Sequence, residues 1–288
     1  MASTQCRGNA AVVVLGDIGR SPRMEYHCLS LLEENFNVDV IGYVETNPLY
    51  AIRRGYPKCK IHELSPVPIT NLIPILKLFF KAIWQTISLL IALMSIRRPD
   101  FLLVQNPPCV PALLVCYIYS AVTRSKLVID WHNYTYTILG LSAGEKSFLC
   151  GIAKRIERFC GQKANANICV TKAMKCDLQK NWNIRDITVL YDRPSARFHS
   201  IDLCRKHEIF MKLSKDYPQF LPKCYSDLKE CGVIESTAFT QKQVNGKVVY
   251  KKQRMAILIS STSWTPDEDF SILIKALKGI FLFYLRFC

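Results

Sequence analysis

The chain has 288 residues, half of them apolar, and its 38 lysines and arginines outnumber its 23 acidic residues to give a net charge of +15. This composition excludes a disordered chain and is sufficient for two domains, or for one large domain with an appendage. The positive charge suits a phosphate-rich partner: nucleic acid, anionic lipid, or a nucleotide with a pyrophosphate-linked substrate. A solvated basic surface explains it equally well.

Apolar runs alternate with helical patterns along the first two thirds of the chain. Ala10–Leu15 is a continuous apolar run, typical of a strand buried on both faces, and Ser21 followed by Pro22 predicts a helix start. Further strands are expected at 38–44, 60–64, 101–105, 126–130, 166–170 and 187–191, and further helices at 111–122, at 145–163 and after Thr171. This alternation predicts a parallel sheet covered by helices on both faces.

The segment 71–96 is strongly apolar, but Lys77 and Lys81 interrupt it. Its uncharged part, Ala82–Ile96, is shorter than the roughly 20 apolar residues that a spanning helix needs. We therefore favour a helix that lies in the membrane interface, with Phe79, Phe80 and Trp84 toward lipid and the lysines at the headgroups. A true span and an ordinary core helix are the alternatives.

After residue 191 the pattern changes. The motif Tyr191–Pro194 closes a first domain that covers 1–195, whereas 196–254 has weak periodicity and is interpreted as a linker or interdomain insertion. One helix is expected within it, around 207–213. A second α/β unit is expected in 255–288.

That last segment reads as a short buried strand from Met255, a Ser/Thr-rich turn, and a capped helix from about Pro266 to Leu277. Hydroxyl groups and free backbone N–H groups just before a helix suit the phosphates of a nucleotide. The tail 278–288 is not expected to continue the fold.

The thirteen cysteines do not follow the pattern of a disulfide framework. Residues 1–10 contain no secretory signal, and neither a Cys-x-x-Cys pair nor zinc-like Cys/His spacing occurs. Most cysteines lie among apolar residues, as Cys28 and Cys116 do, where a reduced thiol packs as a small hydrophobe. We expect a reducing, cytosol-facing protein without a metal site.

The loop Gly16–Arg20 joins the first strand to the first helix. Glycines there let the backbone approach a ligand, and the following helix N-terminus favours a phosphate. The spacing of Gly16 and Gly19 does not match the dinucleotide pattern, however, and a tight turn required only by packing is an equally good interpretation.

The run Asp130–Asn133 places polar side chains at the carboxyl end of a strand, where open α/β sheets bind ligands. An imidazole at His132 is suited to accept a proton from a substrate hydroxyl, and a structural histidine is the alternative. A second small-residue loop is expected at 140–145, before the next helix.

Three motifs together resemble those of one enzyme family, the chitobiosyldiphosphodolichol β-mannosyltransferases: Asp130–Tyr134, Leu190–Pro194 and Thr262–Phe270. The resemblance runs from about Ala10 to Leu277. It implies a two-domain GT-B fold and transfer of mannose from GDP-mannose to dolichol-linked chitobiose at the cytosolic face of the endoplasmic reticulum membrane. It further implies no cofactor besides the donor, and other glycosyltransferases of the same pathway as partners. A nucleic-acid partner is not expected, because the chain has no recognition motif and no interleaving of aromatic and basic residues.

The resemblance also implies roles for particular residues. His132 is the candidate base and Asp130 its orienting group. Candidate substrate-binding and donor-binding residues are Gly16, Gly19, Arg20, Arg193, Thr262, Ser263 and Trp264. The first three would lie at the interdomain cleft, the last three would begin the donor's phosphate site, and Arg193 would bridge the domains or contact the substrate pyrophosphate.

Two features that the resemblance implies are not expected in this chain: the N-terminal membrane anchor and most of the donor domain. A nucleotide-binding α/β domain needs on the order of 100–150 residues, far more than follow Met255. We therefore expect a shortened β-mannosyltransferase with one complete Rossmann-like domain and the first β/α unit of a second. The alternative is a non-catalytic, membrane-associated module that binds the lipid-linked acceptor or partner glycosyltransferases.

Overall fold

The computed structural model describes residues 6–48, 52, 56–68, 73–144, 146–194, 198–222, 232–252, 254–259 and 269–287. The chain divides into two compact units, residues 1–193 and 194–288.

The first unit is built on a seven-stranded sheet in which all neighbouring strands are parallel. The strand order is β3-β2-β1-β4-β5-β6-β7. The strands are β1 (Asn9–Asp17), β2 (Asn37–Tyr43), β3 (Cys59–Glu63), β4 (Phe101–Asn106), β5 (Lys126–Trp131), β6 (Ala166–Cys169) and β7 (Ile187–Val189). This confirms the predicted α/β fold with a Rossmann-like N-terminal domain. The order reverses between β1 and β4, the point at which such sheets bind ligands outside their carboxyl ends.

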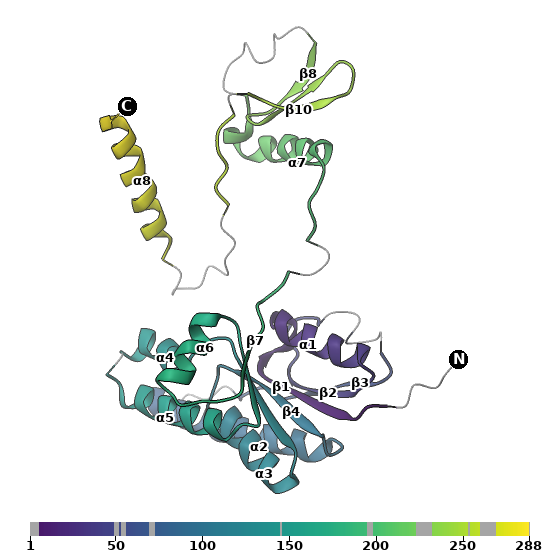
Figure 1. Ribbon diagram of the computed structural model, residues 1–288, viewed down its shortest axis with the longest axis vertical. Helices are drawn as coiled ribbons and strands as arrows, with labels where there is room; N and C mark the ends of the chain where they lie inside the picture. The colour runs from purple at the N-terminus through teal and green to yellow at the C-terminus, as the bar shows by residue number, and fades with distance from the viewer. Residues whose placement is uncertain are drawn as a thin grey trace. The chain divides into compact units, whose positions relative to one another are not determined.

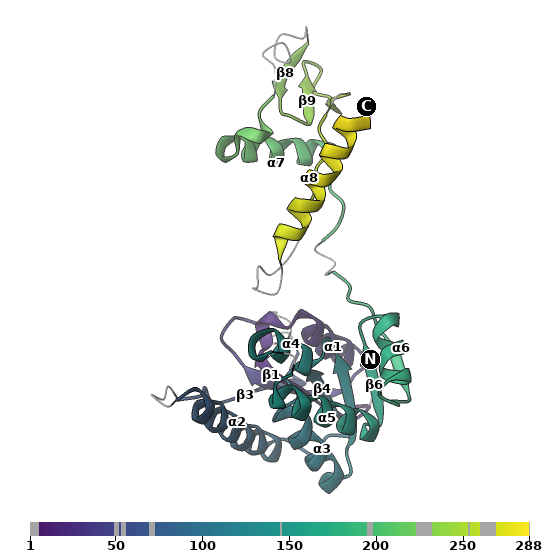
Figure 2. The same cartoon turned by 90° about the vertical axis from the view of Figure 1, so that its left-hand side faces the viewer.

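Helices cover both faces of this sheet (Figures 1 and 2). On one face α1 (Pro22–Glu33) packs through Met24 and Cys28 against Val12 and Val14 of β1. The other face carries α2 (Pro74–Ser95), α3 (Ala112–Thr123) and α5 (Phe148–Lys163). Shorter helices are η1 (Ile18–Arg20), α4 (Thr135–Ala143) and α6 (Lys172–Lys180). Because the strands are buried on both sides, they read as continuous apolar runs in the sequence.

The helices of the first unit differ from the prediction in two places. Residues 140–143, expected as a loop, form the last turn of α4, a helix that the sequence pattern did not reveal because its apolar residues do not gather on one face. Gly144, with φ +85°, ends this helix. The next helix, α5, starts at Phe148 because the Ser147 side chain caps it by accepting from the Leu149 N–H at 3.4 Å.

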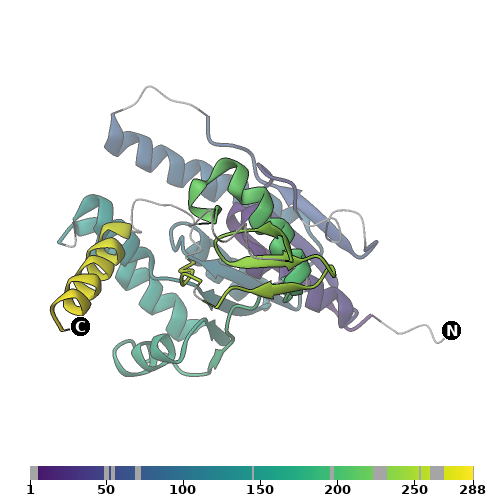
Figure 3. The ribbon, with the colours of Figure 1, turned by 90° about the horizontal axis from the view of Figure 1, so that it is seen from above.

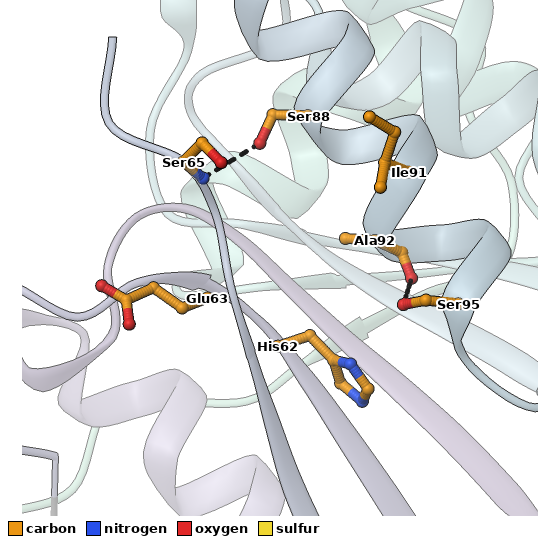
Figure 4. A pocket seen from close by; sticks show the side chains of 7 residues that line it. All are labelled: His62, Glu63, Ser65, Ser88, Ile91, Ala92 and Ser95. Atoms are coloured by element: carbon orange, nitrogen blue, oxygen red, sulfur yellow. Dashed lines mark hydrogen bonds between the residues drawn. The ribbon is translucent and has the colours of Figure 1, made fainter.

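The helix α2 is long and apolar enough, from Leu76 to Ser95, to cross a membrane by length and composition alone. One side of it is nevertheless fixed to the sheet. Leu89 and Leu93 are fully buried. Ser88 Oγ accepts from the Ser65 N–H at 3.1 Å, at the point where the chain leaves β3 (Figure 4). These contacts hold one side of α2 on the sheet, and its association with a membrane stays a prediction.

The opposite side of α2 is an apolar stripe open to solvent. Its members, each at least half exposed, are Leu76, Phe79, Ile83, Ile87, Ile91 and Met94. The prediction was wrong for Trp84, which does not join this stripe: it is partly buried, and its Nε1–H donates to the Ser65 carbonyl at 3.2 Å. Phe80 is also partly buried and stacks on Trp84.

The second unit contains a small helix-on-sheet element within the segment interpreted as a linker or insertion. Helix α7 (Leu203–Asp216) packs on an antiparallel sheet of order β10-β9-β8 (Figures 1 and 3). The sheet strands are β8 (Val233–Ser236), β9 (Thr240–Gln243) and β10 (Val248–Tyr250), and η3 (Pro218–Phe220) follows α7. The rings of Phe210, Phe220 and Phe239 pack together with centroids 5.1–5.9 Å apart. The sequence predicted only the helix, because these strands are short and largely polar.

The last described residues also differ from expectation. The predicted strand from Met255 does not form: residues 254–259 are exposed and unpaired, and an isolated strand leaves its backbone groups to water. Helix α8 (Phe270–Phe287) continues ten residues past the predicted end at Leu277, so the tail is helical rather than unfolded. No proline interrupts this tail.

Candidate active site

The candidate site centres on Asp130, which is fully buried near the carboxyl end of β5. Arg23 of α1 reaches it with two N–H groups: Nε donates to Oδ2 at 2.8 Å and Nη2 donates to Oδ1 at 3.0 Å. The Nε2 atoms of His27 and His132 lie 2.9 Å and 3.0 Å from Oδ2. One carboxylate therefore binds an arginine and two histidines that come from two different elements.

The electrostatics of this cluster fix the protonation of its carboxylate. Burial by itself raises the pKa of Asp130, but hydrogen bonds from His132, His27 and Arg23 outweigh it and hold the pKa well below its ordinary value. An ionised carboxylate only accepts hydrogen bonds, so Nε2 of His132 donates to it. In the neutral ring Nδ1 is then the nitrogen that can accept a proton. The His132 side chain is 22% exposed, so a substrate can reach it.

Arg23 also ties the site to the end of the first unit. Its Nη1 group donates to the Leu190 carbonyl at 2.7 Å and to Asp192 Oδ1 at 2.9 Å. Sequence reasoning missed Arg23 and His27. The available signal was their spacing, because residues four apart on a helix share a face. Cys28, next to His27, is one of the apolar residues of this helix, which indicates that this side of the helix covers the sheet.

A second buried cluster positions the segment that carries His132. The backbone N–H of His132 donates to the Asn106 carbonyl at 2.9 Å, and Asn106 Nδ2 donates to the Asn133 carbonyl at 3.0 Å. Glu157, buried in α5, accepts from Asn106 Nδ2 at 2.8 Å and from the Thr135 N–H at 2.6 Å. Burial raises the pKa of Glu157, and these hydrogen bonds oppose that shift. The cluster caps α4 and fixes the backbone on both sides of His132.

Gln105 is a further polar residue next to the site. In the register of β4 and β5 it lies directly opposite Asp130, so both side chains leave the same face of the sheet. Its Oε1 atom is buried and has no hydrogen-bond partner among the residues that the structure describes. A buried oxygen without a partner is costly, which makes Gln105 a candidate substrate contact.

The loop after β1 is organised by Asp17. Its Oδ1 accepts from the backbone N–H groups of Gly19 and Thr46, and its Oδ2 accepts from Thr46 Oγ1 at 2.6 Å. A Cβ at Gly19 would lie 2.5 Å from Thr46 Oγ1 and 2.7 Å from the Thr46 carbonyl oxygen. Packing therefore requires glycine at this position. Arg20 is exposed, with its Nε 3.6 Å from Asp17 Oδ2. A Cβ at Gly16 would meet no atom closer than 3.9 Å.

These two glycines allow a direct test of the packing interpretation. We expect Gly19→Ala to lower the free energy of unfolding by about 1–3 kcal/mol, because the loop at Thr46 must shift. Gly16→Ala adds the same methyl group in open space and should change stability by less than about 1 kcal/mol. Urea unfolding followed by circular dichroism measures both. Equal effects of the two substitutions would contradict the packing role of Gly19.

Of the predicted site residues, the structure joins Asp130 to His132 by a hydrogen bond. Among the described residues no hydrogen bond or ion pair links Gly16, Gly19 or Arg20 to this pair. Arg193 is exposed and has no hydrogen-bond or ion-pair partner in the described part of the chain. Thr262, Ser263 and Trp264 lie outside the described residues. No group of three His, Cys, Asp or Glu side chains within the described ranges is arranged to hold a metal ion.

Comparisons with known proteins give a clear result for the sequence. No protein-family model matches the chain. It is 42% identical over 269 residues to the chitobiosyldiphosphodolichol beta-mannosyltransferase of Mus musculus, and this alignment covers 93% of this chain and 55% of that protein. The Homo sapiens protein of the same name is 40% identical over 278 residues, 94% of this chain and 59% of that protein. The UDP-glycosyltransferase TURAN of Arabidopsis thaliana gives the same identity and coverage.

Among solved structures, a sucrose-phosphate synthase from Thermosynechococcus elongatus is 11% identical, with a TM-score of 0.49, over 72% of this chain and 53% of that chain.

The parallel sheet and the ionisable groups at its carboxyl edge occur in a chain whose sequence relatives are named as glycosyltransferases. More particularly, almost the whole chain is similar in sequence to chitobiosyldiphosphodolichol β-mannosyltransferases, and the resemblance to that family is confirmed. The chain spans about 55–59% of the length of the curated relatives named above.

Proposed function

We propose that this chain acts in the transfer of mannose from GDP-mannose to dolichol-linked chitobiose, as the acceptor-side part of an inverting β-mannosyltransferase. The observation that carries the proposal is the orientation of His132 by an ionised, fully buried Asp130 near the carboxyl end of β5. A base held in this way can take a proton from a sugar hydroxyl.

The reaction is a single displacement at the anomeric carbon of mannose. His132 Nδ1 accepts the proton of the acceptor hydroxyl while the oxygen of that hydroxyl forms the new bond to the anomeric carbon. The bond from the same carbon to the GDP phosphate oxygen breaks, and GDP leaves with the electron pair. The resulting imidazolium stays beside the Asp130 carboxylate, which stabilises its charge, while Arg23 keeps that carboxylate in place. Gln105 would contact the acceptor from the neighbouring strand.

The remaining parts of the proposal concern the donor and the membrane. Thr262, Ser263 and Trp264 would begin the donor phosphate site, Gly16, Gly19 and Arg20 would bind substrate from the first unit, and Arg193 would contact the substrate pyrophosphate. The apolar stripe of α2 would rest in the cytosolic leaflet of the endoplasmic reticulum, since it exposes large side chains along one side while Lys77 and Lys81 supply charge for the headgroups.

The test is transfer of labelled mannose from GDP-mannose to a chitobiosyl-diphosphate lipid by the full chain. We expect His132→Ala to reduce the transfer rate by roughly 10²–10⁴-fold, the usual contribution of a general base, without changing acceptor binding. His199→Ala, which alters an exposed histidine of the second unit, is the control. A rate for His132→Ala equal to the wild-type rate would remove His132 from the mechanism.

The alternative function is that of a non-catalytic, membrane-associated module that binds the lipid-linked acceptor or partner glycosyltransferases. The exposed apolar stripe of α2 favours the membrane association of such a module. The transfer assay, together with a measurement of acceptor binding, separates the two candidate functions. Acceptor binding without any transfer by the wild-type chain would select the module and overturn the enzymatic proposal.

A further inference from the structure

A groove opens at the carboxyl edge of the sheet between the end of β2 and the first half of α2. Tyr43 and Glu45 line it from β2 and the residues after it, residues 66–68 line it after β3, and Lys77 and Lys81 line it from α2. Phe80 and Gln85 complete the wall, and the Gln85 amide donates to the Tyr43 hydroxyl at 3.2 Å. The groove therefore combines hydrogen-bonding groups, an aromatic ring and two cations.

The two cations in this groove are not used by the fold. Lys77 and Lys81 are both exposed, and neither has an acidic partner among the described residues. They are four residues apart on α2, so both ammonium groups lie on one side of the helix and can bind the same anion. Glu45 at the rim brings one negative charge against these two positive charges, and its carboxylate suits a sugar hydroxyl better than a phosphate.

The position of the lysines around α2 connects the groove to the apolar stripe. At about 100° per residue, the stripe of Leu76, Ile83 and Met94 lies on one side of the helix, and the buried face of Leu89 and Leu93 lies on the other. Lys77 and Lys81 fall between these two faces. An amphiphile whose chain lies along the stripe would therefore have its charged head beside the lysines.

We infer that this groove is the binding site for the diphosphate of a polyisoprenyl diphosphate-linked acceptor, with Lys77 and Lys81 contacting the phosphates and the isoprenoid chain lying along the apolar stripe of α2. This inference rests on the proposed function and deepens it. The ends of β2 and β5 are three strand spacings apart on the same edge, about 14 Å. Sugars attached to a diphosphate in the groove would extend along this edge toward His132.

The charge of the groove selects this occupant. A diphosphate carries more negative charge than the single phosphate of a phospholipid or a polyisoprenyl monophosphate, and two lysines on one helix face match it. The neighbouring apolar stripe favours a lipid-linked diphosphate over a free soluble diphosphate, because a soluble diphosphate has no apolar chain to bury along the stripe.

The experiment measures flotation of the full chain with phosphatidylcholine vesicles, without GDP-mannose and without turnover. One set carries a small fraction of polyprenyl diphosphate, a second the same fraction of polyprenyl monophosphate, and a third phosphatidylserine at matched surface charge. We expect the wild-type chain to bind best to the diphosphate vesicles. Lys77→Gln/Lys81→Gln should weaken that binding about tenfold or more, since each lysine near an anionic surface contributes roughly a factor of five.

Lys126→Gln/Lys163→Gln is the matched control, because it removes two exposed lysines at the amino edge of the sheet and should leave binding unchanged. The inference is overturned if the Lys77/Lys81 variant binds as the wild type does. It is equally overturned if the wild-type chain binds the phosphatidylserine vesicles as well as the diphosphate vesicles, since binding would then depend only on the charge of the vesicle surface. A failure of mannose transfer would contradict the proposed function but would leave this binding result standing.

Discussion

Asp130→Asn should lower the free energy of unfolding by about 3–5 kcal/mol, the usual cost of leaving a buried charge without its partner. The substitution removes the negative charge that faces Arg23 and places amide N–H groups against the donors of the cluster. Urea unfolding of the full chain, followed by circular dichroism, measures the change. Asp192→Asn alters the other acidic partner of Arg23, whose side chain is 67% exposed, and should change stability by no more than about 1 kcal/mol.

The dependence on pH gives this prediction a second readout. The folded-state pKa of Asp130 lies below its unfolded value, so its contribution to stability is complete above the ordinary aspartate pKa of about 4 and is lost as the pH falls toward the folded-state value. The difference in unfolding free energy between the wild type and Asp130→Asn should therefore shrink below about pH 4. A difference that stays constant down to pH 2 would contradict the ionised state of Asp130.

Glu157→Leu is the second substitution with a large expected effect. It keeps a similar volume but removes the acceptor for Asn106 Nδ2 and for the Thr135 N–H. The orphaned Thr135 N–H and the loosened loop at His132 should together cost about 2–4 kcal/mol. The elevated pKa of Glu157 limits the effect, because part of its own ionisation cost disappears with the carboxylate.

Thermal or urea unfolding checks this value, and Arg158→Leu is the control. Arg158 is the next residue on α5 and is exposed, so the same introduction of leucine should change stability by less than about 0.5 kcal/mol. If Glu157→Leu were as stable as the wild type, Glu157 would have no role in holding the segment that carries His132.

The sequence predicted the first unit well because its strands are buried on both faces and its main helices are amphipathic. The run Ala10–Leu15 and the cap at Thr171 both signal their elements locally, and the structure contains β1 and α6 at these positions. Helix α4 and the strands of the second unit were missed, since their side chains show no clear period. Their structure depends on contacts between residues that are distant in the chain, such as Glu157 with Thr135 and Phe239 with Phe210.

The same distinction holds for the site. Asp130 and His132 were found because they are two residues apart at the carboxyl end of a buried strand. Arg23 lies more than a hundred positions away from Asp130 in the sequence. Nothing in the sequence near either residue indicates that α1 covers the end of β5. Hydrogen bonds between distant elements appear only when the sheet order is known.

The position of Arg23 has a consequence for how the chain transmits movement. One guanidinium holds both the carboxylate that orients His132 and the Leu190 carbonyl, just before the first unit ends at Arg193. Any displacement of that exit segment must stretch or break a hydrogen bond of this guanidinium, and Asp130 shares the disturbance. The imidazole is therefore mechanically coupled to the stretch of chain through which the two units are joined.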